Sequence, residues 1–144
     1  MEIVTNSNEE TINFAQRFAK TITPPEVIVL SGDLGAGKTT FSKGFAKGLE
    51  ISEIITSPTF ALLNEYEGKT PLYHFDMYRL SSKEEAIELG FDEYFKHNNG
   101  VILVEWAENV EGLFGAPYIR LTIEKLTENQ RKIKIEEILW TFYA

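Results

Sequence analysis

The sequence contains no cysteine among its 144 residues. Disulfide bonds and thiolate metal sites are therefore excluded, and the composition is compatible with a reducing compartment. No hydrophobic run approaches the roughly 20 residues that a membrane-spanning helix needs. The N-terminal stretch MEIVTNSNEE is acidic and lacks the basic flank and long apolar core of a signal peptide. We therefore expect a cytoplasmic protein with no membrane segment.

Arginine is also scarce, because the chain has only four arginines and a net charge of -8 at pH 7. A protein this acidic is a poor candidate for binding a nucleic acid across its own broad face. The simpler explanation is that the acidity keeps a small protein soluble. If the protein serves a nucleic-acid pathway, we expect a partner to hold the nucleic acid.

The length fits a single domain over residues 1–144, with no internal repeat and no low-complexity segment. A capping box at residues 7–10, followed by apolar residues at helical spacing, predicts a helix over about 8–20. The β-branched run EVIVLS, residues 26–31, predicts a buried strand, and VILVEW, residues 101–106, predicts a second.

Further strand and helix signals follow in alternation. Residues 59–68 and 70–79 predict a β-hairpin, and residues 81–90 predict a short capped helix. Residues 118–126 and 131–138 alternate apolar and polar side chains, which predicts an antiparallel pair. The sequence therefore predicts an α/β sandwich: a single domain with a mixed, partly parallel central sheet and C-terminal antiparallel strands.

The first predicted strand leads into GDLGAGKTT, which matches G-x-x-x-x-G-K-[ST] with a strand before it and a helix after it. The predicted single-domain sandwich is therefore P-loop NTPase-like. Glycines let the backbone approach phosphate oxygens, and loop amides form an anion nest at the positive end of the helix. Lys38 is predicted to reach the β- and γ-phosphates as a catalytic residue, and the Thr39 hydroxyl is predicted to bind Mg²⁺. The predicted phosphate-binding residues are Leu34, Gly35, Ala36, Gly37, Lys38, Thr39 and Thr40. No N-K-x-D element for reading guanine is present, so adenine is the expected base.

Two acids end apolar runs: Glu105 closes VILVE, in the Walker B pattern, and Asp76 closes LYHFD. A P-loop enzyme needs a carboxylate near Mg²⁺ and a group that orients the nucleophile. We assign Glu105 to Mg²⁺, directly or through water. Asp76 is either a second acid around the metal or the catalytic residue that positions the attacking water. Arg79 could pair with Asp76, reach the γ-phosphate or form a surface salt bridge.

The segment Ser57, Pro58 and Thr59 follows the P-loop helix, where GTPases have their first switch. A threonine there could sense Mg²⁺ or the γ-phosphate, although the segment also fits an ordinary turn entering a strand. His74 and Trp106 are expected to be structural, with Trp106 close enough to Glu105 to report on nucleotide occupancy.

Taken in order, the segments GDLGAGKTT, SPTF, YHFDMYRL, EEAIELGFDEYF and VEW resemble the bacterial TsaE family over nearly the whole chain. The resemblance implies the small ATPase of the machinery that makes threonylcarbamoyladenosine in tRNA. It implies ATP and Mg²⁺ as cofactors, weak hydrolysis alone, and docking on a TsaB–TsaD heterodimer. Hydrolysis in that family supports threonylcarbamoyl transfer to adenosine 37 of tRNAs that read ANN codons, and tRNA is reached only through the partners.

The resemblance also assigns roles to residues. It implies Thr39 and Glu105 as metal ligands, Asp76 as the hydrolysis-linked acid, and an adenine side near Asn8 and Arg131. Two other classes stay open: a small P-loop kinase with its own acceptor, and a non-hydrolysing nucleotide-gated binding module. The kinase is disfavoured because the sequence has no arginine-rich insertion that would form a lid over the phosphates.

Overall fold

The computed structural model describes residues 1–33 and 35–140. The strands are β1 (Glu2–Thr5), β2 (Glu26–Ser31), β3 (Leu63–Tyr66), β4 (Leu72–Asp76), β5 (Val101–Glu105), β6 (Tyr118–Lys125) and β7 (Arg131–Ile138). The helices are α1 (Asn8–Thr21), α2 (Lys38–Gly48), α3 (Lys83–Glu88), α4 (Asp92–Lys96) and the short 3₁₀ helix η1 (Ala107–Val110). None of the described helices is long and apolar enough to cross a bilayer.

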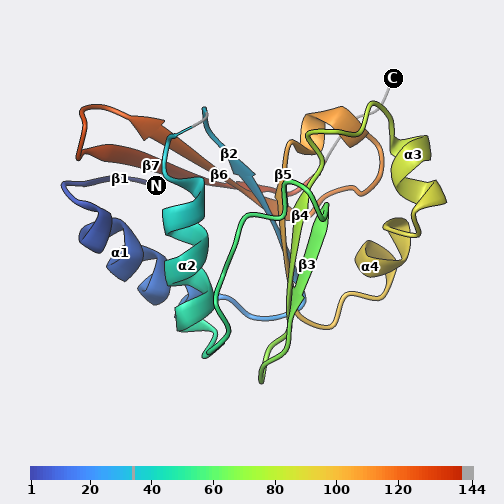
Figure 1. The fold of residues 1–144 in the computed structure, drawn as a ribbon, viewed down its shortest axis with the longest axis horizontal. Helices are drawn as coiled ribbons and strands as arrows, with labels where there is room; N and C mark the ends of the chain where they lie inside the picture. Colours follow the sequence, from blue (N-terminus) through green and yellow to red (C-terminus); the bar gives the residue numbers. More distant parts are fainter. Residues whose placement is uncertain (34, 141–144) are drawn as a thin grey trace.

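The strands form one seven-stranded sheet in the order β1-β7-β6-β2-β5-β4-β3 (Figure 1). β2 runs parallel to both β5 and β6, and β4 runs parallel to β5. The pairs β3–β4, β6–β7 and β1–β7 are antiparallel. The predicted α/β fold, with its mixed sheet and C-terminal antiparallel pair, is therefore confirmed. Because β4, β5 and β2 are parallel neighbours, their carboxyl ends lie at one edge of the sheet.

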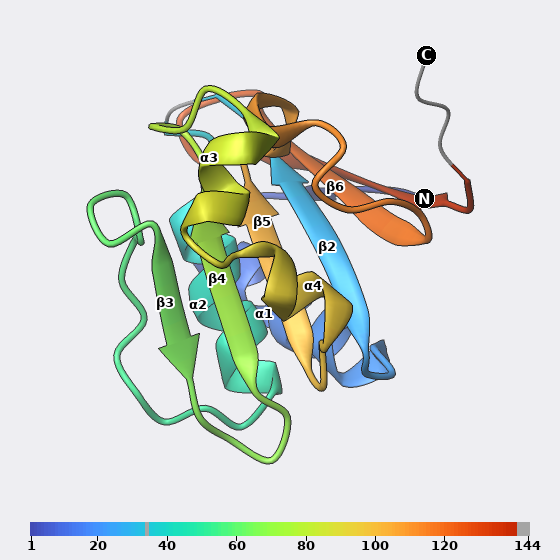
Figure 2. The ribbon, with the colours of Figure 1, turned by 90° about the vertical axis from the view of Figure 1, so that its right-hand side faces the viewer.

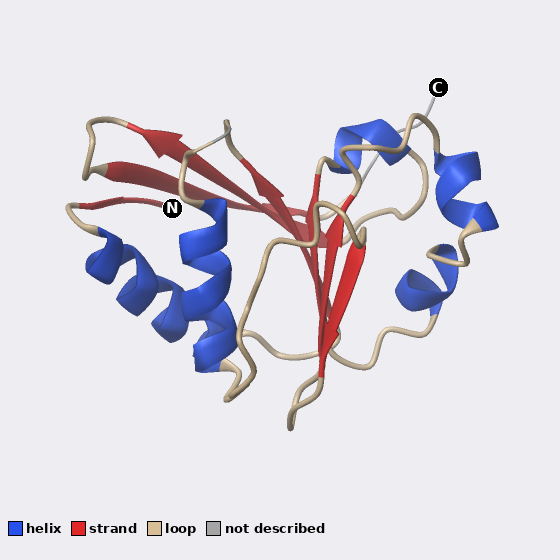
Figure 3. Cartoon of the chain, in the orientation of Figure 1, coloured by secondary structure: helices blue, strands red, loops and turns tan. Residues whose placement is uncertain are grey.

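Helices cover both faces of the sheet. Figures 2 and 3 show α1 and α2 on one side of it, with α3, α4 and η1 on the other. Leu103 of β5 belongs to the apolar cluster beneath α1 and α2, while its neighbours Ile102 and Val104 belong to the cluster on the opposite face. A strand buried on both faces needs apolar residues at successive positions, which explains the uninterrupted run in β5.

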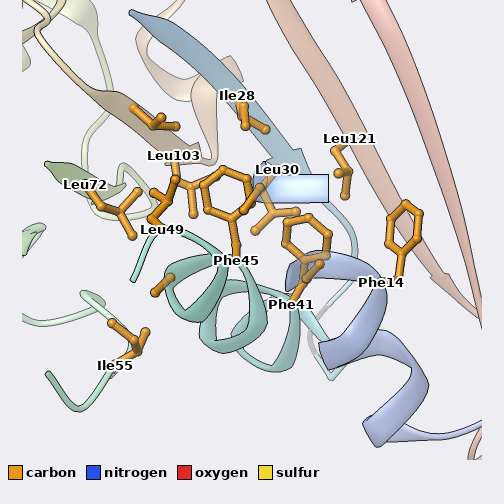
Figure 4. Close-up of a cluster of buried hydrophobic side chains, with 14 of the residues drawn as sticks. Phe14, Ile28, Leu30, Phe41, Phe45, Leu49, Ile55, Leu72, Leu103 and Leu121 are labelled. Atoms are coloured by element: carbon orange, nitrogen blue, oxygen red, sulfur yellow. The ribbon is translucent and has the colours of Figure 1, made fainter. Parts of the chain in front are cut away.

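Aromatic side chains fill the cluster beneath α1 and α2. Phe14 of α1 and Phe41 and Phe45 of α2 point toward the sheet (Figure 4). The two helices approach so closely that a Cβ at Gly44 would collide with a backbone carbonyl of α1. This packing fixes α2, and with it the loop that leads into α2 from β2.

The boundaries of α1 agree with the sequence prediction, since Ser7 caps the helix and its hydroxyl accepts a bond from the Glu10 amide at 3.1 Å. The strand predicted over 59–68 is wrong in its first part, because β3 begins only at Leu63. The preceding residues form a turn, in which the Leu62 amide donates to the Pro58 carbonyl at 2.6 Å and Leu62 has a φ of 69°. The sequence analysis also missed β1, α4 and η1, which have 4, 5 and 4 residues.

Candidate functional site

The glycine-rich loop joins the end of β2 to the start of α2, at the carboxyl edge of the parallel strands. Gly35 and Gly37 have φ angles of 79° and 108°, in the left-handed region that side chains disfavour. The Ala36 amide donates to the Asp33 carbonyl at 2.9 Å and tightens the loop. The amides of the first turn of α2 thus face the space in front of the loop, as an anion site requires. Leu34, also predicted to bind phosphate, lies outside the described residues.

A cavity of about 340 Å³ lies in front of this loop. It brings together residues from the P-loop, the strand ends, the 57–59 segment, the start of α1 and the start of β7. Its lining consists of Asn8, Gly35, Gly37, Lys38, Thr39, Thr40, Ser57, Thr59, Asp76, Glu105, Trp106 and Arg131. Of the predicted site residues that the structure describes, Ala36 and Pro58 are buried beside the cavity without lining it. A larger hollow of about 480 Å³, beside Arg120 and Trp140, contains none of the P-loop residues.

Glu105 is the centre of a buried polar network. Its Oε1 lies 3.5 Å from Lys38 Nζ, and its Oε2 lies 2.6 Å from His74 Nε2. Burial would by itself raise the pKa of Glu105, but the hydrogen bond and positive charge of His74 and the charge of Lys38 outweigh burial and lower it. Glu105 is therefore ionised, and an ionised carboxylate only accepts hydrogen bonds.

Because Glu105 can only accept, His74 is the donor in the hydrogen bond between them. Its Nε2–H donates to Glu105, and its Nδ1 is buried with no hydrogen-bond partner among the described residues. His74 thus orients the Glu105 carboxylate, a role that the sequence analysis missed. The sequence pattern that could have indicated this role is the position of His74 two residues before Asp76, because residues at this spacing lie on the same face of a strand.

Asp76 lies beside Glu105, because the two are register partners at the ends of β4 and β5. Its Oδ1 accepts the Tyr78 amide at 3.0 Å, and its Oδ2 accepts the Thr59 hydroxyl at 3.1 Å. The hydroxyls of Thr59 and Ser57 are 2.6 Å apart. The predicted switch segment is thus attached through Thr59 to the acid predicted to act in hydrolysis.

Two cationic side chains lie over aromatic rings near the cavity. Lys38 Nζ lies 5.3 Å from the ring centroid of Trp106. Trp106 lines the cavity and also packs against the apolar cluster beneath α3 and α4. Arg79 lies over the Phe60 ring, with its guanidinium carbon 4.7 Å from the centroid. Within residues 1–33 and 35–140, no ion pair joins Arg79 to Asp76, so that predicted alternative is not the arrangement found here.

The two residues predicted to lie on the adenine side, Asn8 and Arg131, both line the cavity. Asn8 is the first residue of α1, and Arg131 is the first residue of β7. Arg131 also contacts the P-loop, since its Nε donates to the Ala36 carbonyl at 2.7 Å. A contact of either residue with a base stays a prediction.

The donor set fits a nucleotide bound with Mg²⁺. Thr39, Asp76 and Glu105 offer the hydroxyl and carboxylate oxygens that this cation prefers. Among the described residues, no group of three or more His, Cys, Asp or Glu side chains could hold a metal alone. A metal in this cavity would therefore complete its coordination with phosphate oxygens and water, as Mg²⁺ does in P-loop sites.

Known proteins resemble the chain over most of its length. The family model "Threonylcarbamoyl adenosine biosynthesis protein TsaE" matches residues 5–133. The tRNA threonylcarbamoyladenosine biosynthesis protein TsaE of Bacillus subtilis is 47% identical over 126 residues, which cover 87% of this chain and 78% of that protein. The Rickettsia typhi protein of the same name is 44% identical over 143 residues, with 95% and 96% covered. The crystal structure of Bacillus subtilis YdiB matches with a TM-score of 0.78 and 42% identity, covering 92% of this chain and 82% of that one.

Proposed function

Because the chain belongs to the TsaE family of tRNA threonylcarbamoyladenosine biosynthesis, we propose that it is a Mg²⁺-dependent ATPase. In this proposal it is a single cytoplasmic domain that docks on a TsaB–TsaD heterodimer and supports threonylcarbamoyl transfer to tRNA held by those partners. The observation that carries the ATPase assignment is the single cavity that joins the P-loop, Lys38, Asp76 and Glu105. A phosphate-binding loop with two acids at adjacent strand ends is the arrangement that P-loop hydrolysis needs.

The P-loop and Lys38 bind the phosphate chain in this proposal. Loop amides and the start of α2 hold the phosphate oxygens, and Lys38 leaves its contact with Glu105 to pair with the terminal phosphates. Mg²⁺, when bound, would supply positive charge that neutralises the phosphate chain. Thr39 and Glu105 would hold that cation, and His74 keeps the Glu105 carboxylate oriented toward the loop.

Asp76 acts on the water in this proposal. Each of its oxygens accepts one hydrogen bond in the structure, from Tyr78 or from Thr59, so each keeps a lone pair for a further donor. A water that donates to Asp76 would be held at the γ-phosphate side of the cavity. Positioning of this kind stabilises the transition state more than the bound substrate.

The phosphate site is tested by Lys38→Ala. We expect ATP to bind about tenfold to hundredfold more weakly, because a charge-assisted contact contributes roughly 1.5–3 kcal/mol. Isothermal titration calorimetry with Mg²⁺-ATP measures the change. Lys43→Ala is the matched control, since Lys43 is exposed on the same helix and does not line the cavity. An unchanged affinity for ATP in Lys38→Ala would contradict the assignment.

The metal role of Glu105 is tested by Glu105→Gln, which keeps the size of the side chain and its contact with His74. We expect Mg²⁺ to improve ATP affinity about tenfold less than in the wild type, because an amide is a much poorer Mg²⁺ ligand than a carboxylate. The measurement compares ATP affinity with Mg²⁺ and with EDTA. Glu108→Gln, at an exposed position outside the cavity, should behave as wild type. If Glu105→Gln keeps the full Mg²⁺ effect, Glu105 is not the metal ligand.

A further inference from the structure

Arg131 is the first residue of β7, and its side chain contacts the P-loop. The residue is buried, with 8% of its surface exposed. Its Nε donates to the Ala36 carbonyl at 2.7 Å. Its Nη1 donates to the carbonyls of Thr127, Glu128 and Gln130 at 3.0, 3.1 and 3.0 Å. Two of its three nitrogens therefore bind backbone carbonyls, which leaves Nη2 for any contact with a ligand.

These bonds connect two segments that are distant in the sequence. Ala36 precedes Arg131 by 95 residues and lies in the middle of the glycine-rich loop. The three other carbonyls belong to the turn between β6 and β7. A charged donor to a buried carbonyl is among the stronger hydrogen bonds in a protein, so this guanidinium ties the loop to the turn.

The guanidinium also packs against the backbone of the loop. A Cβ placed on Gly37 would lie 3.5 Å from Arg131 Nε and 3.9 Å from its Cδ. Gly37 is the residue before α2 and has a φ of 108°, a backbone conformation that glycine adopts readily and that a side chain would disfavour. Arg131 thus supports the loop at two successive residues, through the Ala36 carbonyl and alongside Gly37.

We propose that Arg131 is a positioning residue for the P-loop, and that it sets affinity for the phosphate chain without reading the base. The proposal rests on the nucleotide-binding function proposed above. It departs from the expectation that Arg131 contacts adenine. A base-reading residue needs its donors free for the ligand, whereas Nε and Nη1 already bind the protein.

The test uses Arg131→Lys in the full chain. Lysine keeps the positive charge but lacks the rigid planar fork in which Nε binds the Ala36 carbonyl while Nη1 binds the β6–β7 turn. Competition titrations with Mg²⁺ measure affinities for ATP, GTP and inorganic tripolyphosphate. We expect all three to weaken by the same factor, roughly tenfold, with an unchanged ATP-to-GTP preference.

Two control variants test whether a weaker β6–β7 turn, or the loss of any positive charge near Arg131, would lower ATP affinity in the same way. Thr127→Ala removes the 3.1 Å bond from the Gln130 amide to the Thr127 hydroxyl and weakens the turn without touching Ala36. Lys132→Gln removes the next positive charge along β7, which pairs with Glu2 at 3.7 Å. Both should retain wild-type affinity for ATP. If Arg131→Lys does not fold, as judged by its thermal melt, Arg131→Gln replaces it with the same expectation.

Two results would overturn the proposal. A loss of ATP-over-GTP preference with unchanged tripolyphosphate binding would make Arg131 a base-reading residue. A lower melting temperature with unchanged affinity for all three ligands would limit its role to the turn. A wild-type chain that binds no Mg²⁺-ATP would instead contradict the proposed function itself, so the two failures are distinguishable.

Discussion

Replacing Asp76 with asparagine should lower partner-stimulated ATP hydrolysis by about 10²- to 10³-fold and leave ATP affinity close to that of the wild type. Asparagine keeps the size of the side chain, and its carbonyl can still accept the Tyr78 amide. Its NH₂ group can donate to the Thr59 hydroxyl, so the 57–59 segment stays attached. What asparagine lacks is the negative charge and the second acceptor oxygen that would hold the attacking water.

The separation of binding from turnover follows from where Asp76 acts. A group that acts mainly in the transition state changes the rate constant for hydrolysis and leaves ground-state binding nearly unchanged. Single-turnover phosphate release in the presence of the TsaB–TsaD heterodimer measures the rate, and calorimetry measures the affinity. Asp92→Asn is the matched control, because it removes a carboxylate that pairs with Lys96 on α4, outside the cavity. Hydrolysis at the wild-type rate by Asp76→Asn would show that the acid has been assigned wrongly.

Local sequence patterns were sufficient to predict the glycine-rich loop between β2 and α2, while its binding of phosphate stays a prediction. The P-loop depends on neighbours in the chain: a strand, glycines at fixed spacing, Lys38 and a helix start. The family prediction, which combined this motif with short segments around Asp76 and Glu105, is confirmed. Each of those acids was also predicted to end a strand, and both do. What the sequence left open was their pairing, because the order β5-β4 depends on tertiary packing.

The contacts that the sequence did not reveal are those between distant residues. His74 binds Glu105 from 31 positions away, and Arg131 binds Ala36 from 95 positions away. Neither contact leaves a local pattern, since one depends on strand order and the other on the return of the β6–β7 hairpin toward the P-loop. The strand start at Leu63 was missed for a related reason. The residues before Leu63 form a turn that brings Thr59 into contact with Asp76. These residues are therefore not part of the strand that the apolar run predicted.

Adding a TsaB–TsaD heterodimer should raise steady-state hydrolysis at saturating ATP by ~10³-fold or more. Of the described residues that line the cavity, Arg131 is the sole arginine, and its Nε and Nη1 bind backbone carbonyls. Among the described residues around the cavity, only Nη2 of this one arginine is therefore left to stabilise charge on the γ-phosphate, and the isolated chain should hydrolyse ATP slowly. The missing stabilisation must come from a partner group or from ordering of the 57–59 segment around the phosphate.

Thr59→Ala distinguishes the contribution of that segment. The Thr59 hydroxyl joins the segment to Asp76, and its loss should reduce the stimulation by the partners far more than it reduces ATP affinity. Thr21→Ala, which removes an exposed hydroxyl at the far end of α1, is the matched control and should be stimulated as the wild type is. Phosphate release is measured with and without partners at saturating ATP. A chain that hydrolyses ATP rapidly alone and does not respond to the heterodimer would refute the proposed function, because its own residues would then supply the full catalytic site.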